Sequence, residues 1–328
     1  MKPRRHAHSI AAALATAIAS ALALGACAKT DKPQTVRLDY ATYNPVGLLL
    51  REKGFLEQEL ASDGVKVEWV KSLGSNKSLE LLSSKSVDFG STAGAAALLA
   101  KANGNPIRAV YVYSKPEWTA LVTRADAGVE SIADLRGKKI AVTRGTDPFV
   151  FLLRALDSVG LTDKDVEIVP LQHPDGKAAL ERGDVAAWAG LDPLMATAEL
   201  ESGARLFFRN ADWNTYGVLN VRDDFAQRHP AYVNKVLAAY EKARAYAIAH
   251  PDELRAALVK EAHLTPAVAD AVLARTDLSS SLIGDRQRDA ISAAGGVLKK
   301  TGIVKADADV SAVAASLIDP AFGRALAH

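Results

Sequence analysis

Cysteine is almost absent from this sequence of 328 residues, because Cys27 is the only one. A single cysteine excludes an intramolecular disulfide and any zinc site that needs two cysteines. The seven histidines are scattered, and no H-E-x-x-H pair occurs among them. The sequence therefore argues against a resident metal, and we expect no cofactor.

Signatures of common enzymes are also absent. The sequence contains no G-x-S-x-G nucleophile elbow. The stretch Arg136-Gly137-Lys138-Lys139 resembles the end of a phosphate-binding loop, but Ile132 stands where the first glycine is required, and Lys139 replaces the Ser or Thr. We therefore expect neither hydrolytic nor phosphoryl-transfer activity, and we predict that the protein is not an enzyme.

The chain has little net charge. Its formal charge is +2, and the first 26 residues contribute Lys2, Arg4 and Arg5 but no acidic residue. Removing these three from the 40 basic residues leaves 37 against 38 acidic ones, a net charge of −1. A nearly neutral chain argues against a nucleic acid as the partner.

The N-terminus has the pattern of an export signal. A basic start is followed by an apolar run, Ile10 to Ala26, that is too short to span a membrane comfortably. The run ends in Leu24-Gly25-Ala26-Cys27, which resembles the lipobox of bacterial lipoproteins. We predict a lipoprotein signal peptide at residues 1–26, lipid on Cys27 that anchors the protein to a membrane, and a tether at residues 27–34. The alternative is an ordinary signal peptide followed by a chance cysteine.

Strand-like and helix-like segments alternate between Val36 and Val221. This alternation is typical of α/β proteins with largely parallel sheets. After Asp223 the sequence is almost wholly helical. The predicted strands are Val36–Tyr40, Val65–Lys71, Val87–Gly90, Ile107–Ser114, Thr119–Thr123, Lys139–Thr143, Val166–Pro170, Val185–Ala189, Arg205–Phe208 and Gly217–Val221. The predicted helices are Gly47–Lys53, Leu79–Ser84, Ala95–Ala102, Ile132–Arg136, Pro148–Val159, Gly176–Arg182 and Leu194–Glu201.

Small or capping residues stand between a strand and a helix at four places: Ser75-Asn76, Gly94-Ala95, Gly145-Thr146-Asp147 and Asp192-Pro193. Such residues leave the first N–H groups of a helix open to an anion. Ordinary capping is the alternative at each place, and at residues 91–100 (STAGAAALLA) close packing of small residues is another. In combination they favour a ligand site, because ligands of open α/β sheets bind outside the carboxyl ends of the strands.

Longer stretches resemble a known family. "SVDFGSTAG", "SIADLRGKKIAVTRGTDPFVFLLRALDSVGL" and "ALERGDVAAWAGLDPLMATAELESGARLF" look like the substrate-binding proteins of bacterial ABC importers for aliphatic sulfonates, taurine and nitrate. The resemblance implies an α/β, two-lobed periplasmic-binding-protein fold (type II). Each lobe would be a mixed sheet flanked by helices, and two hinge crossovers would join the lobes. Lobe one would comprise residues 35–121 and 222–328, so that the helical tail packs on lobe one. Lobe two would comprise residues 122–221.

The same resemblance implies a function. The protein would capture a small organic anion, an aliphatic sulfonate before others, and deliver it to an ABC permease in the cytoplasmic membrane. It would work in the periplasm or on the outer face of the cytoplasmic membrane. Taurine, nitrate and a pyrimidine vitamin precursor are alternative ligands for the same fold. An enzyme on a similar two-lobed frame is the alternative of a different class.

The family's ligand loops, carried over to this sequence, give a set of candidate ligand-binding residues. Two loops depart from the pattern of the sulfonate binders: Gly94-Ala95-Ala96-Ala97 replaces Gly-Asp-Ala-Pro, and Gly145-Thr146-Asp147 replaces Gly-Ser-Ser or Gly-Ser-Thr. The candidates from these loops are Ser75, Asn76, Gly94, Ala95, Gly145, Thr146, Asp147 and Asp192.

Asp147 and two aromatic residues need separate interpretations. A carboxylate about 4 Å from a sulfonate would repel it by about 4 kcal/mol at intermediate dielectric. Asp147 therefore either caps its own helix or, like Asp192, holds the ammonium of an amino-sulfonate such as taurine. Tyr43 and Trp213 have polar, loop-like neighbours, so we predict that they form walls of the ligand pocket.

Overall fold

The structure is a computed structural model that describes residues 32–324. The main unit of the chain begins at Pro33. The predicted signal peptide, the lipidation site Cys27 and the tether as far as residue 31 lie outside the described residues. Among residues 32–324, no helix combines the length and the apolar character needed to cross a membrane.

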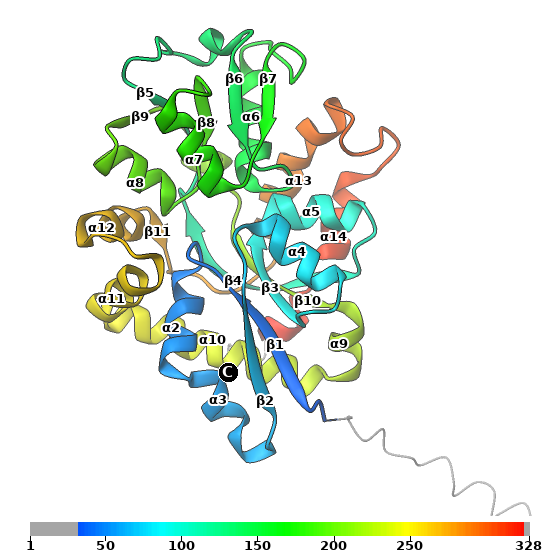
Figure 1. Ribbon diagram of the computed structural model, residues 1–328. Coiled ribbons are helices and arrows are strands. Elements are labelled where there is room, and N and C mark those ends of the chain that lie inside the picture. Colours follow the sequence, from blue (N-terminus) through cyan, green and yellow to red (C-terminus); the bar gives the residue numbers. More distant parts are fainter. Residues whose placement is uncertain (1–31, 325–328) are drawn as a thin grey trace, which may run out of the picture. The chain divides into compact units, whose positions relative to one another are not determined.

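Eleven strands of the described chain form two mixed sheets (Figure 1). Their bounds are β1 Thr35–Tyr40, β2 Lys66–Lys71, β3 Phe89–Ala93, β4 Ile107–Pro116, β5 Ala120–Arg124, β6 Lys139–Val142, β7 Glu167–Pro170, β8 Ala187–Ala189, β9 Ala204–Arg209, β10 Gly217–Arg222 and β11 Thr276–Asp277. The first sheet has the order β11-β4-β10-β3-β1-β2, and the second has the order β7-β6-β8-β5-β9. Parallel and antiparallel neighbours occur in both sheets, which confirms the predicted two-lobed α/β fold with mixed sheets.

Helices flank both sheets. Their bounds are α2 Pro45–Lys53, α3 Phe55–Leu60, α4 Ser75–Ser83, α5 Gly94–Ala102, α6 Asp147–Ser158, α7 His173–Arg182, α8 Leu194–Glu201, α9 Asp223–Arg228, α10 Pro230–Ala249, α11 Pro251–Ala262, α12 Pro266–Ala274, α13 Asp285–Lys300, α14 Val310–Leu317 and α15 Ala321–Arg324. The predicted segments up to residue 221 are all present, with ends within four residues of those predicted, and the one at Ile132 is a 3-10 helix.

Local sequence explains many of the helix ends. Proline occupies the first turn of α2, α6 and α7, where its missing N–H costs nothing and its fixed φ suits the helix. Gly54 and Gly183 end α2 and α7 with φ of 62° and 82°, a left-handed conformation that glycine adopts without strain. The order of strands and helices is therefore fixed largely by short-range signals.

Burial follows the position of each strand in its sheet. Every residue of β3 and β10, in the middle of the first sheet, is buried. The edge strand β2 instead alternates between more and less exposed residues. Both central strands also bury polar side chains, among them Ser91, Thr92 and Asn220.

Two crossovers join the sheets: residues 117–119 between β4 and β5, and residues 210–216 between β9 and β10. From here on, lobe one denotes the first sheet with its helices, and lobe two denotes the second sheet with its helices. Pairing with β3 and β4 places β10 in lobe one. This corrects the sequence prediction, which assigned residues 217–221 to lobe two and residues 120–121 to lobe one.

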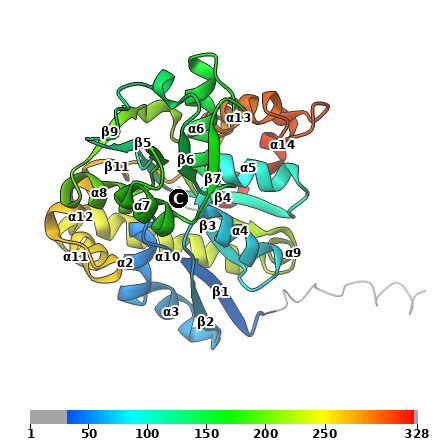
Figure 2. The ribbon, with the colours of Figure 1, turned by 45° about the horizontal axis from the view of Figure 1, so that its top comes forward.

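The C-terminal tail packs on lobe one, as the sequence predicted, and also on helices of lobe two (Figure 2). α10 lies against α2 and α3, but α13 packs against both α5 and α6, and α12 packs against α8. Val297 and Leu298 of α13 join the apolar cluster that contains Phe149 of α6. Val268 of α12 joins a cluster with Ala196 of α8. Apolar burial therefore ties the tail to lobe two as well.

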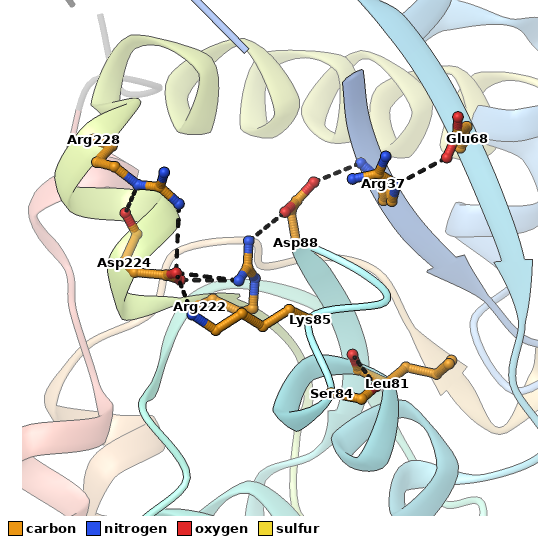
Figure 3. Close-up of polar contacts among 9 residues, drawn as sticks. All are labelled: Arg37, Glu68, Leu81, Ser84, Lys85, Asp88, Arg222, Asp224 and Arg228. Atoms are coloured by element: carbon orange, nitrogen blue, oxygen red, sulfur yellow. Dashed lines mark hydrogen bonds and ion pairs between the residues drawn. The ribbon is translucent and has the colours of Figure 1, made fainter. Parts of the chain in front are cut away.

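A charged network closes the end of the first sheet where β1 begins and β10 ends (Figure 3). Arg222 Nη2 donates to Asp88 Oδ1 at 2.7 Å, and Arg37 N donates to Asp88 Oδ2 at 2.8 Å. The Arg222 and Asp88 side chains are only 9% and 5% exposed. Because removing one partner leaves the other charge buried and uncompensated, such pairs are costly to break.

Candidate functional site

The N-termini of α4, α6 and α7 meet where the two lobes face each other. A Cβ placed on Gly145, just before α6, would lie 3.6 Å from Asn76 Cβ in the first turn of α4. A Cβ placed on Gly74, just before α4, would lie 3.2 Å from Cδ2 and Nε2 of His173, the first residue of α7. Three helix starts from two lobes therefore converge.

Buried polar atoms at this junction have no hydrogen-bond partner among the described residues. They are Asn76 Oδ1, Gln172 Oε1, both ring nitrogens of His173, and Trp188 Nε1. His173 is 1% exposed and Trp188 is 0% exposed. Since buried polar groups are nearly always paired, this concentration marks a candidate ligand site. We call Asn76, Gly145, Gln172, His173 and Trp188 the interlobe cluster.

Trp188 belongs to the cluster through its contact with α7. It lies in β8, and a Cβ placed on Gly176 of α7 would approach its Nε1 to 2.8 Å. Gly176 and His173 are three residues apart and share a face of α7. The absence of a side chain at Gly176 therefore lets the indole lie beneath the start of this helix.

The junction favours an anion without using a cation. None of the five cluster residues carries a positive charge, and burial lowers the pKa of His173 to about 3, so its imidazole is neutral near pH 7. The first-turn N–H groups of each helix give its N-terminus a partial positive charge. Arg144 is exposed, with its guanidinium 5.3 Å from the centre of the Phe149 ring. Within residues 32–324, no three His, Cys, Asp or Glu residues are placed to bind a metal ion.

Asp147, the first residue of α6, accepts hydrogen bonds from both crossovers. Trp118 Nε1 and Thr215 N donate to Asp147 Oδ2, each at 2.9 Å, and Thr215 Oγ1 donates to Asp147 Oδ1 at 2.7 Å. All three hydrogen bonds of the Asp147 carboxylate come from the crossovers and none from α6, so the interpretation that Asp147 caps its own helix is wrong. Its two oxygens already accept three protein hydrogen bonds, which argues against a contact with a ligand ammonium. Burial raises the pKa of the Asp147 carboxyl, and the three donors oppose that rise.

The start of α5 faces the second crossover. Gly94 N donates to Tyr216 O at 2.9 Å, and Ala95 N donates to Thr215 Oγ1 at 3.0 Å. A Cβ placed on Gly94 would lie 2.5 Å from Cγ1 of Ile291 in α13. Both amides are occupied, so this arrangement argues against the predicted ligand role of Gly94 and Ala95. The small residues here serve close packing.

Tyr43 and Ser75 are engaged within lobe one. Tyr43 OH donates to Ser91 O at 3.0 Å, and the Tyr43 ring meets the Trp118 ring edge-on with centroids 6.0 Å apart. Ser75 Oγ accepts a hydrogen bond from Ala93 N at 2.9 Å. Ser75 lies next to the cluster through its backbone, but Tyr43 is packed against the first crossover.

Asp192 and Trp213 make their contacts elsewhere. Asp192 Oδ1 accepts from Ala196 N at 2.9 Å, and Asp192 Oδ2 lies 3.5 Å from Nη1 of Arg275 in the tail. The Trp213 ring packs against Phe151 of α6, with centroids 5.9 Å apart. Of the ten predicted ligand-binding residues, the structure brings together Ser75, Asn76, Gly145 and Thr146.

Sequence analysis missed His173 and Gln172, although a usable signal was present. Leu171-Gln172-His173-Pro174 repeats the arrangement of Gly145-Thr146-Asp147-Pro148, in which polar residues follow a strand and a proline opens a helix. Thr215 and Trp118 had no comparable signal, because their partner Asp147 is distant in sequence.

Comparisons with known proteins agree on one family. The NMT1/THI5 like family matches residues 48–254. A putative aliphatic sulfonates-binding protein of Escherichia coli (strain K12) is 29% identical over 237 residues, which cover 72% of this chain and 74% of that protein. The protein of the same description from Bacillus subtilis (strain 168) is 27% identical over 241 residues, 73% of each chain.

A solved structure shares the fold. The alkanesulfonate-binding protein SsuA from Xanthomonas axonopodis pv. citri, bound to MOPS, aligns with a TM-score of 0.79 and 24% identity, covering 88% of this chain and 99% of that one. The family match spans more than half of the 328 residues. This chain therefore belongs to the NMT1/THI5-like family.

Proposed function

We propose that this chain is the extracytoplasmic solute-binding component of an ABC importer. It captures a small organic anion, an aliphatic sulfonate before others, and performs no chemistry itself. The observation that carries the proposal is the interlobe cluster, where three helix N-termini from two lobes converge beside buried, uncharged and unpaired polar atoms. The descriptions of the relatives from Escherichia coli, Bacillus subtilis and Xanthomonas support the choice of ligand.

An anion at the cluster would be held by both lobes. Hydrogen bonds to a charged group contribute about 1.5–3 kcal/mol each. Each helix N-terminus adds about 0.3–1 kcal/mol for a negative charge. α4 belongs to lobe one, whereas α6 and α7 belong to lobe two. One guest would therefore stabilise the lobes in contact with each other.

Entry of the guest requires the lobes to separate. The closeness of Asn76 to Gly145, and of Gly74 to His173, leaves the two lobes in contact at the cluster. Separation at the two crossovers would expose the helix starts, and closure on the anion would exclude water and strengthen each polar contact. The two crossovers would act as the hinges. Lobe one would then comprise the residues before 117 and after 216, and lobe two would comprise the residues between the two crossovers.

Among the alternative ligands, an amino-sulfonate is disfavoured. Asp147 was a candidate partner for its ammonium, but that carboxylate is committed to Trp118 and Thr215. Asp192, the other candidate, faces Arg275. A pyrimidine would need stacked aromatic rings, whereas Trp213 packs in the apolar cluster of lobe two.

The cellular setting is also a proposal. A permease in the cytoplasmic membrane would receive the solute, and a lipid on Cys27 would hold the protein in the periplasm or on the outer face of that membrane. Fractionation of cells that produce Cys27→Ala tests the anchor: the variant should leave the membrane fraction for the soluble one. Retention of the variant at the membrane would exclude lipid on Cys27 as the anchor.

A ligand panel tests the function. Thermal unfolding of the purified protein is measured with hexanesulfonate, MOPS, taurine, nitrate and a pyrimidine, because a ligand bound only by the folded state raises the melting temperature. Hexanesulfonate should give a rise that grows with concentration, and calorimetry should give one site per chain. A rise with the pyrimidine alone, or with no sulfonate at all, would overturn the proposal.

A further inference from the structure

His173 is a deeply buried, unpaired side chain at the junction of the two lobes. It opens α7, is 1% exposed, and has a partner for neither ring nitrogen among the described residues. Its Nε2 lies 3.2 Å from the position that a Cβ on Gly74 would take. Burial holds the pKa of the imidazole at about 3, so the ring is an uncharged group with one donor and one acceptor nitrogen near pH 7.

Asn76 meets His173 over the same glycine. Asn76 Oδ1 lies 2.8 Å from that Cβ position on Gly74, on the side of lobe one, and it too has no partner. The two side chains come from different lobes, converge on one residue and make no hydrogen bond to each other. Buried polar groups are nearly always paired, so two unpaired side chains that meet from different lobes are open to a third participant.

We propose that His173 is a ligand contact that determines specificity: its imidazole donates a hydrogen bond to an oxygen of the guest, with Asn76 and Trp188 beside it. The inference rests on the proposed function, and it assigns to α7 a role that the family resemblance did not give it. Trp188 Nε1 can only donate, which matches a guest rich in oxygen acceptors.

The donor set selects the charge of the guest. Burying a negative charge is costly unless the site compensates it, and the cost rises steeply for a second charge. The cluster supplies dipoles and no cation, and the Asp147 carboxylate is buried at the start of α6. A monoanion such as a sulfonate therefore fits, whereas a dianion such as sulfate is rejected.

Variants of His173 test the contact. His173→Phe keeps a ring and removes both nitrogens, and His173→Gln keeps a donor and an acceptor. The matched control is His229→Gln, because His229 is also buried with an unpaired Nδ1 but packs against Phe225 of lobe one. Each protein is first shown to be folded by circular dichroism, and calorimetry then gives Kd for hexanesulfonate and for sulfate.

The wild-type protein and His229→Gln should bind hexanesulfonate alike and at least tenfold more tightly than sulfate. His173→Phe should weaken the sulfonate Kd by about ten- to hundredfold, as expected for one hydrogen bond to a charged group, and His173→Gln should recover part of the loss. The ¹⁵N resonances of the His173 ring, identified by their absence from His173→Gln, should shift when hexanesulfonate is added. A purely structural histidine would show no such shift at saturation.

The outcomes separate the two proposals. If the wild-type protein binds no sulfonate, the proposed function fails, and this inference fails with it. If the wild-type protein binds hexanesulfonate but folded His173→Phe binds it equally well, only the assignment of His173 is overturned. Sulfate bound as tightly as hexanesulfonate would overturn the selection of monoanions.

Discussion

Asp147 and Thr215 are joined by two hydrogen bonds: Thr215 Oγ1 donates to Asp147 Oδ1 at 2.7 Å, and Thr215 N donates to Asp147 Oδ2 at 2.9 Å. The same Oγ1 accepts from Ala95 N at 3.0 Å. A chain of hydrogen bonds therefore runs from the start of α5, through the second crossover, to the start of α6. Trp118 of the first crossover donates to the same carboxylate. One residue of lobe two thus contacts both proposed hinges.

Asp147→Asn should destabilise the protein. The carboxylate offers two acceptor oxygens to its three donors, whereas the asparagine amide offers only one. The NH₂ group of the asparagine is itself a donor, so it would face those donors without forming a hydrogen bond. A buried donor left without a partner costs about 1–3 kcal/mol, so the free energy of unfolding in urea should fall by at least that amount. Asp184→Asn, at an exposed position of lobe two, is the control and should change it by less than about 0.5 kcal/mol. Equal stability of the two variants would contradict the role of Asp147.

Gly94→Ala should also destabilise the protein, through overpacking. Its Cβ would lie 2.5 Å from Cγ1 of Ile291, and inserting a methyl group into a packed core costs about 1–3 kcal/mol. Gly296→Ala in the same helix as Ile291 meets nothing within 4 Å and should stabilise by about 0.5–1 kcal/mol. In the double variant Gly94→Ala/Ile291→Ala, the smaller side chain at position 291 should relieve part of the overpacking. Chemical denaturation measures the free energy of unfolding of Gly94→Ala, Gly296→Ala and the double variant. An unchanged free energy of unfolding in Gly94→Ala would show that α13 does not pack there as described.

Asp147 and Gly94 show what the sequence could and could not predict. Strand and helix positions follow from local periodicity, capping and proline placement, so the fold and its family could be predicted from the sequence. Whether a helix start is open to a ligand depends on what covers it. Ala95 and its cover Thr215 are 120 positions apart, and no local pattern connects them.

The same reason explains the mixed outcome at the other candidates. Asn76 and Gly145 share a junction because their helices face each other across the lobes. Trp213 has polar neighbours in sequence, which suggested a pocket wall, but its partners Phe151 and Phe208 come from distant elements and form a core. Side-chain partners, more than secondary structure, were beyond the reach of the sequence.

Asp192 should make stability depend on pH. Burial raises the pKa of its carboxyl to about 7, although the Arg275 guanidinium opposes the rise. The unfolded value is about 3.9, so the folded state binds this proton more tightly. The stabilisation is full below about pH 4 and is lost as the pH rises toward about 7.

Asp192→Asn isolates this contribution. Its melting temperature minus that of the wild-type protein should increase between pH 5 and pH 8, because the variant cannot ionise. His173 acts in the opposite direction, since its lowered pKa favours the folded state at higher pH, and the subtraction cancels its effect. Asp184→Asn is again the control and should give a constant difference. If the difference in melting temperature between Asp192→Asn and the wild-type protein stayed constant from pH 5 to pH 8, Asp192 would not be the source of the pH dependence.

The pair Asp88–Arg222 should contribute far more than the neighbouring pair Arg37–Glu68 (Figure 3). Asp88→Asn removes one of the two carboxylates that pair with the buried Arg222 guanidinium and leaves only Asp224, whose side chain is 39% exposed, so we expect a loss of about 3 kcal/mol, the lower end of the range for a broken buried pair. Glu68→Gln breaks an ion pair whose side chains are 42% and 52% exposed, and should cost at most about 1 kcal/mol. Urea titration measures the free energy of unfolding of both variants. Similar losses in the two would show that burial does not decide how much each ion pair contributes to stability.

The central claim is that one anion binds where the starts of α4, α6 and α7 meet. A crystal structure of the protein with hexanesulfonate tests it most directly. The account predicts sulfonate oxygens about 2.7–3.1 Å from N–H groups of Asn76 on one lobe and of Thr146 or His173 on the other. A sulfonate bound at the start of α5, or held by one lobe only, would contradict it.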